Sequence, residues 1–387
     1  MRFARIELTN WKNFKAASVA LGGRVFLVGP AASGKSNFLD AFRFLKDLAS
    51  DGGGLGKAID QRDGMPRVRT LYARKNVEVG IRVEVHTDNH DGWTYQIGLR
   101  PVSQRDSRPV IASERVQRVA DGSAAEVLLD RPDEKDRGDP ERLFQSSIQQ
   151  VAENRRFREL VEFFRSISYL HLVPQLVREQ QSPRANGIGL DPFGRDLLDR
   201  IRNTPTSTRR GRLSRIQKVL KIVAPQMKDL ELWIDEHGRP HLRVRFEHWR
   251  PHGAYQNESQ FSDGTLRLIG LLWSLQEPAG PLLLEEPELS LHPAIVRRLA
   301  PFIHRAQTAG QGRQVILSTH STELLTDPGI PPDEVLLVQP ASEGSRITEG
   351  ASVPEIVRLM RAGIPASEAI LPRTEPGQLH LFDKAKA

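Results

Sequence analysis

The segment GPAASGKS, residues 29–36, matches the pattern G-x-x-x-x-G-K-[ST] at every fixed position. Gly34 allows the backbone to come close to a phosphate group, and successive backbone N–H groups can then surround its anionic oxygens. Lys35 supplies positive charge to the β and γ phosphates, and the Ser36 hydroxyl is a ligand for Mg²⁺. The alternative is a glycine-rich turn without a ligand, but a strand pattern before the segment and a helix pattern after it favour a phosphate cradle. The predicted ATP contacts are Gly29, Pro30, Ala31, Ala32, Ser33, Gly34, Lys35, Ser36 and Asn37.

A second segment, GPLLLEEPELSLHP at residues 280–293, is an apolar strand pattern that ends in paired carboxylates. It resembles the Walker B strand of the ATP-binding-cassette (ABC) superfamily, whose usual acidic pair is Asp-Glu. That resemblance implies that Glu285 supports the Mg²⁺ ion and that Glu286 is the base that polarises the attacking water. Because the first acid here is Glu and is one methylene longer, Glu285 would reach the metal directly or through a water. The alternative is a strand end with solvated acids.

The segment FSDGTLRL, residues 261–268, resembles the signature motif of the same superfamily. The resemblance implies that Ser262 and Gly264 lie at a helix N-terminus and offer N–H groups to a γ-phosphate. In that superfamily they complete the site of a second, facing subunit. Asp263 and Thr265 depart from the commonest signature. Taken alone, the serine is equally well explained as an ordinary helix N-cap.

The segment QVILSTHSTELL, residues 314–325, is an apolar strand pattern that ends next to His320. It resembles the switch-histidine strand, which implies that His320 contacts the γ-phosphate and the attacking water. Residues 290–292, with the sequence SLH, match the short loop that contacts the second subunit in the superfamily. A lone histidine at a strand end is also common without any function. Because all the motifs follow the superfamily's order and spacing, together they indicate an ABC-type ATPase head.

The distances between motifs narrow the branch of the superfamily. Ser36 and Ser262 are 226 residues apart (262 − 36), which is too far for a transporter-type cassette and too close for the coiled-coil arm of an SMC protein. The start of the chain, IELTNWKNF, resembles the compact RecF-like and OLD-like AAA ATPases. That resemblance implies that Asn13, Phe14 and Lys15 help to hold the nucleotide. No Asp-x-Asp cluster follows the switch strand, which disfavours the TOPRIM nuclease of OLD proteins. Gln175 is the candidate for the glutamine loop.

The fold that we expect is α/β: a P-loop NTPase with an ABC-type head, an antiparallel β subdomain and an inserted helical lobe. Strict alternation of apolar residues over 77–85 and 93–99 predicts a hairpin. Helical patterns cover roughly 141–165, a buried strand pattern covers 167–174, and alternation of helix and strand after residue 261 predicts a parallel sheet. The expected domains are the two parts of the ATPase head (1–60 and 256–350), a β-rich subdomain (61–165), an inserted lobe (166–255) and a C-terminal helix and tail (351–387).

The composition is that of a soluble globular protein of 387 residues with a net charge of +7 and a pI near 9.8. It contains no cysteine, which excludes disulfides and thiolate metal sites. The chain has no apolar run of membrane-spanning length and no secretory start, so we expect a cytoplasmic protein without a membrane partner. The helical segment 209–221 carries basic residues at intervals of three beside an apolar face. They could contact DNA phosphates or form a solvated surface: Arg209, Arg212, Arg215, Lys218 and Lys221.

These features predict an ATP-hydrolysing, RecF/OLD-like ATPase that forms a homodimer around two nucleotides. Its output would be action on DNA or gating of a separately encoded effector, in DNA repair or phage defence. One alternative is a weakly hydrolysing nucleotide sensor that serves as a scaffold for a separate toxin or nuclease. A less favoured alternative is the ATPase subunit of a membrane transporter. ATP turnover measured with and without DNA separates the first two, and membrane fractionation tests the third.

Overall fold

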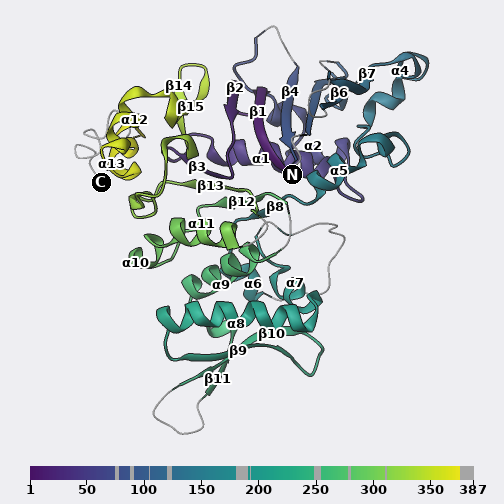
Figure 1. Ribbon diagram of the computed structural model, residues 1–387. Coiled ribbons are helices and arrows are strands. Elements are labelled where there is room, and N and C mark those ends of the chain that lie inside the picture. The colour runs from purple at the N-terminus through teal and green to yellow at the C-terminus, as the bar shows by residue number, and fades with distance from the viewer. Residues whose placement is uncertain are drawn as a thin grey trace, which may run out of the picture.

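The computed structural model describes residues 1–74, 78–87, 91–103, 105–119, 124–179, 191, 193–247, 254–277, 280–309 and 312–374 (Figure 1). Within that part, a 12-stranded sheet crosses the upper part of the view, and a three-stranded sheet with its helices forms a lower lobe. Residues 375–387, which include most of the predicted tail, lie outside the described residues. No helix in the described ranges is both long enough and apolar enough to cross a membrane.

The large sheet has an antiparallel half and a parallel half. Neighbours from β7 to β14 are antiparallel, and neighbours from β14 to β8 are parallel. In spatial order its strands are β7 (Glu126–Arg131), β6 (Pro109–Val119), β5 (Gly92–Pro101), β4 (Val79–His86), β1 (Arg2–Trp11), β2 (Phe14–Ala20), β15 (Gly344–Glu349), β14 (Val335–Ala341), β3 (Arg24–Val28), β13 (Val315–Thr319), β12 (Leu282–Glu285) and β8 (Ser168–Leu170).

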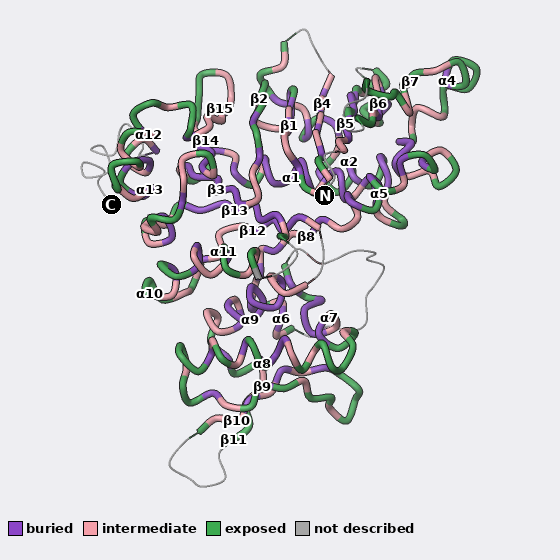
Figure 2. Tube along the Cα trace, viewed as in Figure 1, coloured by how far each residue is buried: buried purple, intermediate pink, exposed green. Residues whose placement is uncertain are grey.

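The parallel half is buried on both faces, as the apolar runs of its strands require. Every residue of β3 and β13 is buried, and Figure 2 shows these strands as a continuous buried band. One face packs with α1 and α5, and the other with α9 and α11. The helices are α1 (Lys35–Ala49), α2 (Leu55–Asp60), α3 (Met65–Val68), α4 (Glu134–Gly138), α5 (Arg158–Arg165), α6 (Pro174–Arg178), α7 (Leu197–Asn203), α8 (Thr206–Val223), α9 (Asp263–Leu275), α10 (Pro293–Val296), α11 (Leu299–Ala309), α12 (Pro354–Arg361) and α13 (Ala366–Ile370).

The antiparallel half contains the predicted hairpin, formed by β4 and β5. Burial along β4 alternates residue by residue, because one face packs against the core and the other does not. The helix expected over 141–165 is wrong for most of its length, since only Arg158–Arg165 is α-helical. The preceding segment instead gives backbone carbonyls to the buried guanidinium of Arg131, which bonds the oxygens of Arg142 and Gln145 at 2.9 Å each. A regular helix would use those carbonyls internally.

The strand expected over 167–174 is shorter than predicted. Only Ser168–Leu170 pairs with β12, and Pro174 starts helix α6. A proline at the first helical turn is favourable because its missing N–H would have no partner there. The chain therefore leaves the sheet just beyond the β12 carboxylates, and it turns toward the lower lobe (Figure 1).

The lower lobe consists of helix α8 against the sheet of β9 (Met227–Ile234), β10 (Pro240–Phe246) and β11 (Ala254–Asn257). The apolar face of α8 lies in the same core cluster as the inner residues of β9 and β10. This cluster also contains the inner residues of α9, so the lobe is joined to the parallel half of the large sheet by continuous apolar packing. The prediction that the basic segment is helical is confirmed by α8. Its basic residues, however, do not all lie on one exposed face.

The prediction that the basic residues of α8 form one exposed face is wrong. Arg212 is buried, and its guanidinium lies 5.2 Å from the centre of the Trp273 ring. Arg209 donates to backbone carbonyls near the helix start, and Arg215 donates to the Gln276 side chain at 2.6 Å. Arg212 is therefore withdrawn from solvent, whereas Arg215, Lys218 and Lys221 stay exposed.

Candidate functional site

The parallel pairing brings the predicted motifs to one edge of the sheet. Strand β13 lies between β3 and β12, with Thr319 opposite Val28 and Glu285 opposite Ser318. Because parallel strands end at the same edge, the loop after β3, the turn after β12 and His320 after β13 lie side by side. Motifs that are distant in the sequence thus form one cluster.

The loop that follows β3 has the backbone of a phosphate cradle. Gly34 adopts a φ of 103°, in the left-handed region, and Ala32 a φ of 59°. A Cβ at Gly29 would lie 2.1 Å from the Val338 carbonyl oxygen, so a larger residue cannot occupy this position without moving β14. The loop therefore folds tightly against β14 and leads directly into the N-terminus of α1.

Lys35 lies across this loop. Its Nζ donates to the carbonyls of Gly29 at 2.8 Å and Pro30 at 2.9 Å, and the residue is 6% exposed. Burial lowers the pKa of Lys35, while the nearby carboxylates of Glu286, Glu288 and Glu285 oppose that shift. The ammonium group of Lys35 therefore lies between the loop carbonyls, to which it donates, and the carboxylates that follow β12, which act on it electrostatically.

Asn13 braces the loop from behind. Its Nδ2 donates to the Ser33 carbonyl at 3.1 Å and to Ser345 Oγ at 2.6 Å, and its Oδ1 accepts from Asn37 Nδ2 at 2.8 Å. A Cβ at Gly34 would lie 1.9 Å from Asn13 Nδ2. This close approach is a second reason, besides the positive φ, why the position requires glycine. Asn13 thus holds the cradle in shape.

The other two residues of the predicted N-terminal cluster are placed less favourably. Phe14 has no exposed surface, and its ring packs edge-on to Phe38 at 6.3 Å, so its side chain belongs to the core and cannot contact a nucleotide. Lys15 is partly exposed, and its Nζ pairs with Glu343 on the β14–β15 turn at 2.5 Å. The neighbouring Lys12, which the sequence reasoning missed, lines a cavity beside α1.

Ser36 and Glu285 form the candidate metal site. Ser36 Oγ donates to Glu285 Oε1, and Tyr169 from β8 donates to the other carboxylate oxygen. Burial raises the pKa of Glu285, and neighbouring Glu286 adds to that shift. These are hard oxygen donors of the kind that Mg²⁺ uses together with substrate phosphates. No group of three or more acidic or histidine side chains in the described ranges could hold a metal alone, so such an ion would depend on the phosphates of its ligand.

Glu286 follows β12 in a constrained backbone position. Its φ is 44°, which is unfavourable for a residue with a side chain. Its backbone N–H donates to the Ser318 carbonyl at 3.1 Å, and its Oε1 lies 3.1 Å from His320 Nδ1. The predicted base and the predicted switch histidine are therefore in direct contact.

The signature segment begins helix α9 as predicted. Ser262 is the N-cap, and its Oγ accepts from the Thr265 N–H at 3.2 Å. A Cβ at Gly264 would lie 2.5 Å from the carbonyl oxygen of Ser290, which follows the acidic strand. The signature and the loop at 290–292 therefore form one continuous surface, and no hydrogen bond among the described residues joins it to the phosphate cradle.

The glutamine-loop candidate lies at this surface. Gln175 Nε2 donates to Asp263 Oδ2 at 3.2 Å, at the start of α9. The residues of this segment that reach Glu285 are instead Tyr169 and His171, whose Nδ1 lies 3.4 Å from the Glu285 carbonyl oxygen. The strand expected over 167–174 carried a weak signal, because a Tyr and a His two residues apart would point to the same side of it. His171 lies one residue beyond the observed end of β8.

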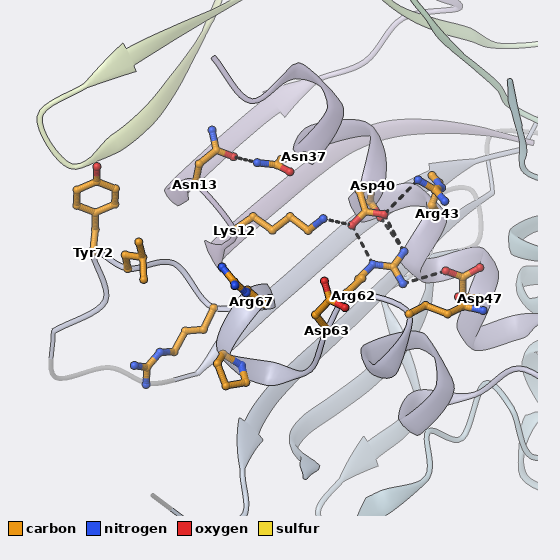
Figure 3. A pocket seen from close by; sticks show the side chains of 14 residues that line it. Lys12, Asn13, Asn37, Asp40, Arg43, Asp47, Arg62, Asp63, Arg67 and Tyr72 are labelled. Atoms are coloured by element: carbon orange, nitrogen blue, oxygen red, sulfur yellow. Dashed lines mark hydrogen bonds and ion pairs between the residues drawn. The ribbon is translucent and has the colours of Figure 1, made fainter. Parts of the chain in front are cut away.

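A polar cavity of about 630 Å³ opens along α1 beside Asn13 and Asn37 (Figure 3). On its floor, Asp40 pairs with Lys12 at 2.6 Å and with Arg62 at 2.9 Å. The cavity also contains two arginines, Arg67 and Arg69, whose guanidinium groups make no hydrogen bond or ion pair with any residue that the structure describes. The cavity can therefore accept an anionic, polar ligand at the edge of the cradle.

Comparison with known proteins agrees with this geometry. The family model described as "AAA domain, putative AbiEii toxin, Type IV TA system" matches residues 24–326. Among solved structures, the chain is similar to the Smc head domain with an extended coiled coil bound to the C-terminal domain of ScpA, derived from Pyrococcus furiosus (TM-score 0.55, 13% identity, covering 93% of this chain and 99% of that chain). It is also similar to the SmcHead bound to the C-winged helix domain of ScpA (TM-score 0.54, 15% identity, covering 90% and 98%).

No curated protein matches the chain. At such low identity the structural likeness shows the fold alone, and that fold confirms the expected P-loop head within an α/β architecture. The family match covers the phosphate cradle, the signature, the acidic strand and the switch histidine. The chain belongs to this AAA family and has the ABC-type ATPase fold of SMC heads.

Proposed function

We propose that the protein binds and hydrolyses ATP at the carboxyl edge of β3, β13 and β12. The observation that carries this proposal is the contact between residues from all three strand ends: Ser36 with Glu285, and Glu286 with His320. A phosphate cradle alone would support binding. A half-buried carboxylate beside the Ser36 hydroxyl, next to a second carboxylate paired with a histidine, supports hydrolysis as well.

The nucleotide would be oriented by the chain's own groups. The loop N–H groups and Lys35 bind the phosphates, and the nucleoside end extends toward the cavity that contains Arg67 and Arg69. Ser36 and Glu285 would hold Mg²⁺, which supplies charge neutralisation to the β and γ phosphates. Glu286 accepts a proton from the attacking water, and His320 orients that carboxylate.

The proposal includes a dimer that forms on ATP. Ser262 and Gly264 lie on the same surface as residues 290–292, and they do not bond to the cradle of their own chain. A second copy facing this surface would receive the α9 N-terminus at its bound γ-phosphate. Hydrolysis at Glu286 would then remove that contact and release the two copies.

The output of this cycle is the finer part of the proposal: movement on DNA or gating of a separate effector, in DNA repair or phage defence, within the cytoplasm. The burial of Arg212 removes part of the argument for a DNA contact along α8. Lys218 and Lys221 remain exposed there. ATP turnover with and without duplex DNA, and identification of co-purifying proteins, separate the two outputs.

The decisive experiment compares wild type with Glu286→Gln. This change keeps the shape of the strand end and removes the base, so ATP hydrolysis should fall by about 100-fold or more. ATP binding should persist, because the phosphate contacts belong to other groups. Size-exclusion chromatography with light scattering should show the variant as a dimer with ATP and Mg²⁺ and as a smaller species without them. Glu236→Gln, on the exposed β9–β10 turn, is the matched control.

Three outcomes would contradict different parts of the proposal. Turnover of Glu286→Gln at the wild-type rate would mean that the strand-end base is assigned wrongly. A wild type that binds ATP but hardly hydrolyses it, with or without DNA, would favour the nucleotide-sensing scaffold. If Glu286→Gln binds ATP without changing its oligomeric state, the proposed ATP site stands but the proposed ATP-dependent dimer does not.

A further inference from the structure

A third carboxyl group of the acidic turn, Glu288, is buried behind the candidate hydrolysis site. The residue is 7% exposed and makes no ion pair with any residue in the described ranges. Its Oε1 accepts from Thr319 Oγ1 at 2.5 Å, and its buried Oε2 has no hydrogen-bond partner in the part of the chain that the structure describes. Burial raises the pKa of this carboxyl group. For stability alone this is an unfavourable arrangement, because a buried carboxyl oxygen without a donor carries a desolvation cost.

The contact partner of Glu288 holds the turn on which His320 lies. Thr319 Oγ1, besides donating to Glu288, accepts from the Ser321 backbone N–H at 3.0 Å. His320 is the residue between these two bonded neighbours. A single hydroxyl therefore fixes the backbone on both sides of the histidine, and Glu288 fixes that hydroxyl.

The turns after β12 and β13 are thus joined twice. On the exposed side, Glu286 Oε1 meets His320 Nδ1 at 3.1 Å. On the buried side, Glu288 meets Thr319. The backbone of Glu286 has a strained φ of 44°, and strained positions persist only where surrounding contacts determine them. The buried contact is the one that solvent and ligand cannot compete for.

We propose that Glu288 is a positioning residue for ATP hydrolysis: through Thr319 it sets the place of His320 and, through His320, the orientation of the Glu286 carboxylate. This inference rests on the proposed hydrolysis at Glu286. Glu288 acts here as a hydrogen-bond acceptor, so its negative charge is not required. The contact with Thr319 affects the rate of the chemical step. It does not affect nucleotide affinity, which depends on the phosphate cradle.

The test separates acceptor, charge and packing. Thr319→Val keeps the shape of the side chain and removes the hydroxyl, and Glu288→Ala removes the acceptor. Each should lower kcat about 10- to 100-fold with KM for ATP within about twofold, because a small displacement of a catalytic group costs rate more than binding. Thr319→Ser and Glu288→Gln, which keep the hydroxyl and the acceptor, should stay within about threefold of wild type. Thr322→Val, an exposed change on the same turn, should have no effect.

A double-mutant cycle checks that the effect passes through the histidine. In a His320→Ala background, Thr319→Val should cause no further loss, since the residues act as one unit. Independent, additive losses would overturn the proposal. A Glu288→Gln variant as impaired as Glu288→Ala would also overturn it, because Glu288 would then act through its charge.

A measurement without turnover keeps this inference distinct from the proposed function. The imidazole ¹⁵N resonances of His320 can be identified by their loss in His320→Gln. They should shift in Thr319→Val and remain in place in Thr322→Val and Thr319→Ser. If the wild type does not hydrolyse ATP, the proposed function fails, while these resonances still decide whether the hydroxyl positions the histidine. Unchanged resonances in Thr319→Val would overturn the inference.

Discussion

The sequence predicted two candidate functional regions, the carboxyl edge of the parallel strands and helix α8. The fold brings the residues of the first region together and separates those of the second. At the strand edge, residues from separate motifs come into contact, as in the pair of Glu286 and His320. Along α8, residues that share one helical periodicity are separated into different environments. Arg212 is buried against an aromatic ring, whereas Lys218 is exposed.

The difference has a topological cause. Parallel neighbours must end at one edge, so residues placed just after successive apolar runs have little choice about where they meet. A helix face has no such constraint. Whether a basic residue on it faces solvent depends on what else packs there, and α9 packs against α8 through Trp273. A strand-end motif therefore carries more functional information than a charge stripe of similar regularity.

The largest effect expected at the strand edge is loss of ATP binding in Lys35→Ala. The variant removes the charged donor that the proposal assigns to the phosphates, which should weaken ATP binding by about 100-fold or more. Isothermal titration calorimetry with ATP and Mg²⁺ measures it. Lys57→Ala, which removes an exposed lysine that donates to the Gly52 carbonyl, should bind like wild type. If Lys35→Ala also binds ATP like wild type, the motifs at the strand edge predict function no better than the charge pattern of α8 does.

The next effect tests whether the edge extends to a second copy. In the Glu286→Gln background, Ser262→Arg should abolish the ATP-dependent dimer, because a bulky side chain would occupy the N-terminus of α9. Ser262→Ala is the matched control: it loses the hydroxyl's bonds to the Thr265 backbone N–H and to Thr265 Oγ1, and loss of the cap costs about 1 kcal/mol of stability. Light scattering with ATP and Mg²⁺ distinguishes them. A dimer that survives Ser262→Arg would restrict the candidate site to one chain.

The smallest effect belongs to α8 and concerns stability. Arg212→Ala removes a buried guanidinium over Trp273 and should lower the free energy of unfolding by about 1–3 kcal/mol. Lys218→Ala, on the exposed side of the same helix, should change it by less than about 0.5 kcal/mol. Urea denaturation followed by circular dichroism compares the two variants. Equal effects would mean that the two positions share one environment, as the sequence pattern predicted.

Packing between distant segments explains the errors of the sequence-based predictions. Asn13 and Phe14 are adjacent in an N-terminal motif, yet one braces the cradle and the other lies in the core. The segment before α5 has a helical pattern, but it gives its carbonyls to Arg131 instead. Tyr169 gave only a weak signal and Glu288 gave none, because their significance lies in contacts with Glu285 and Thr319.

The sequence by itself determined the order of strands and helices around the motifs, the ABC-type fold class and the identity of the residues at each strand end. Apolar runs, a glycine-rich turn and a helix cap act over a few residues, so local chemistry is sufficient to specify them. Only the tertiary structure decided which of these residues touch. The strain at Glu286, the buried bond from Thr319 to Glu288 and the burial of Arg212 all arise between segments far apart in the chain. Such contacts depend on close packing of the whole core, which no local pattern records.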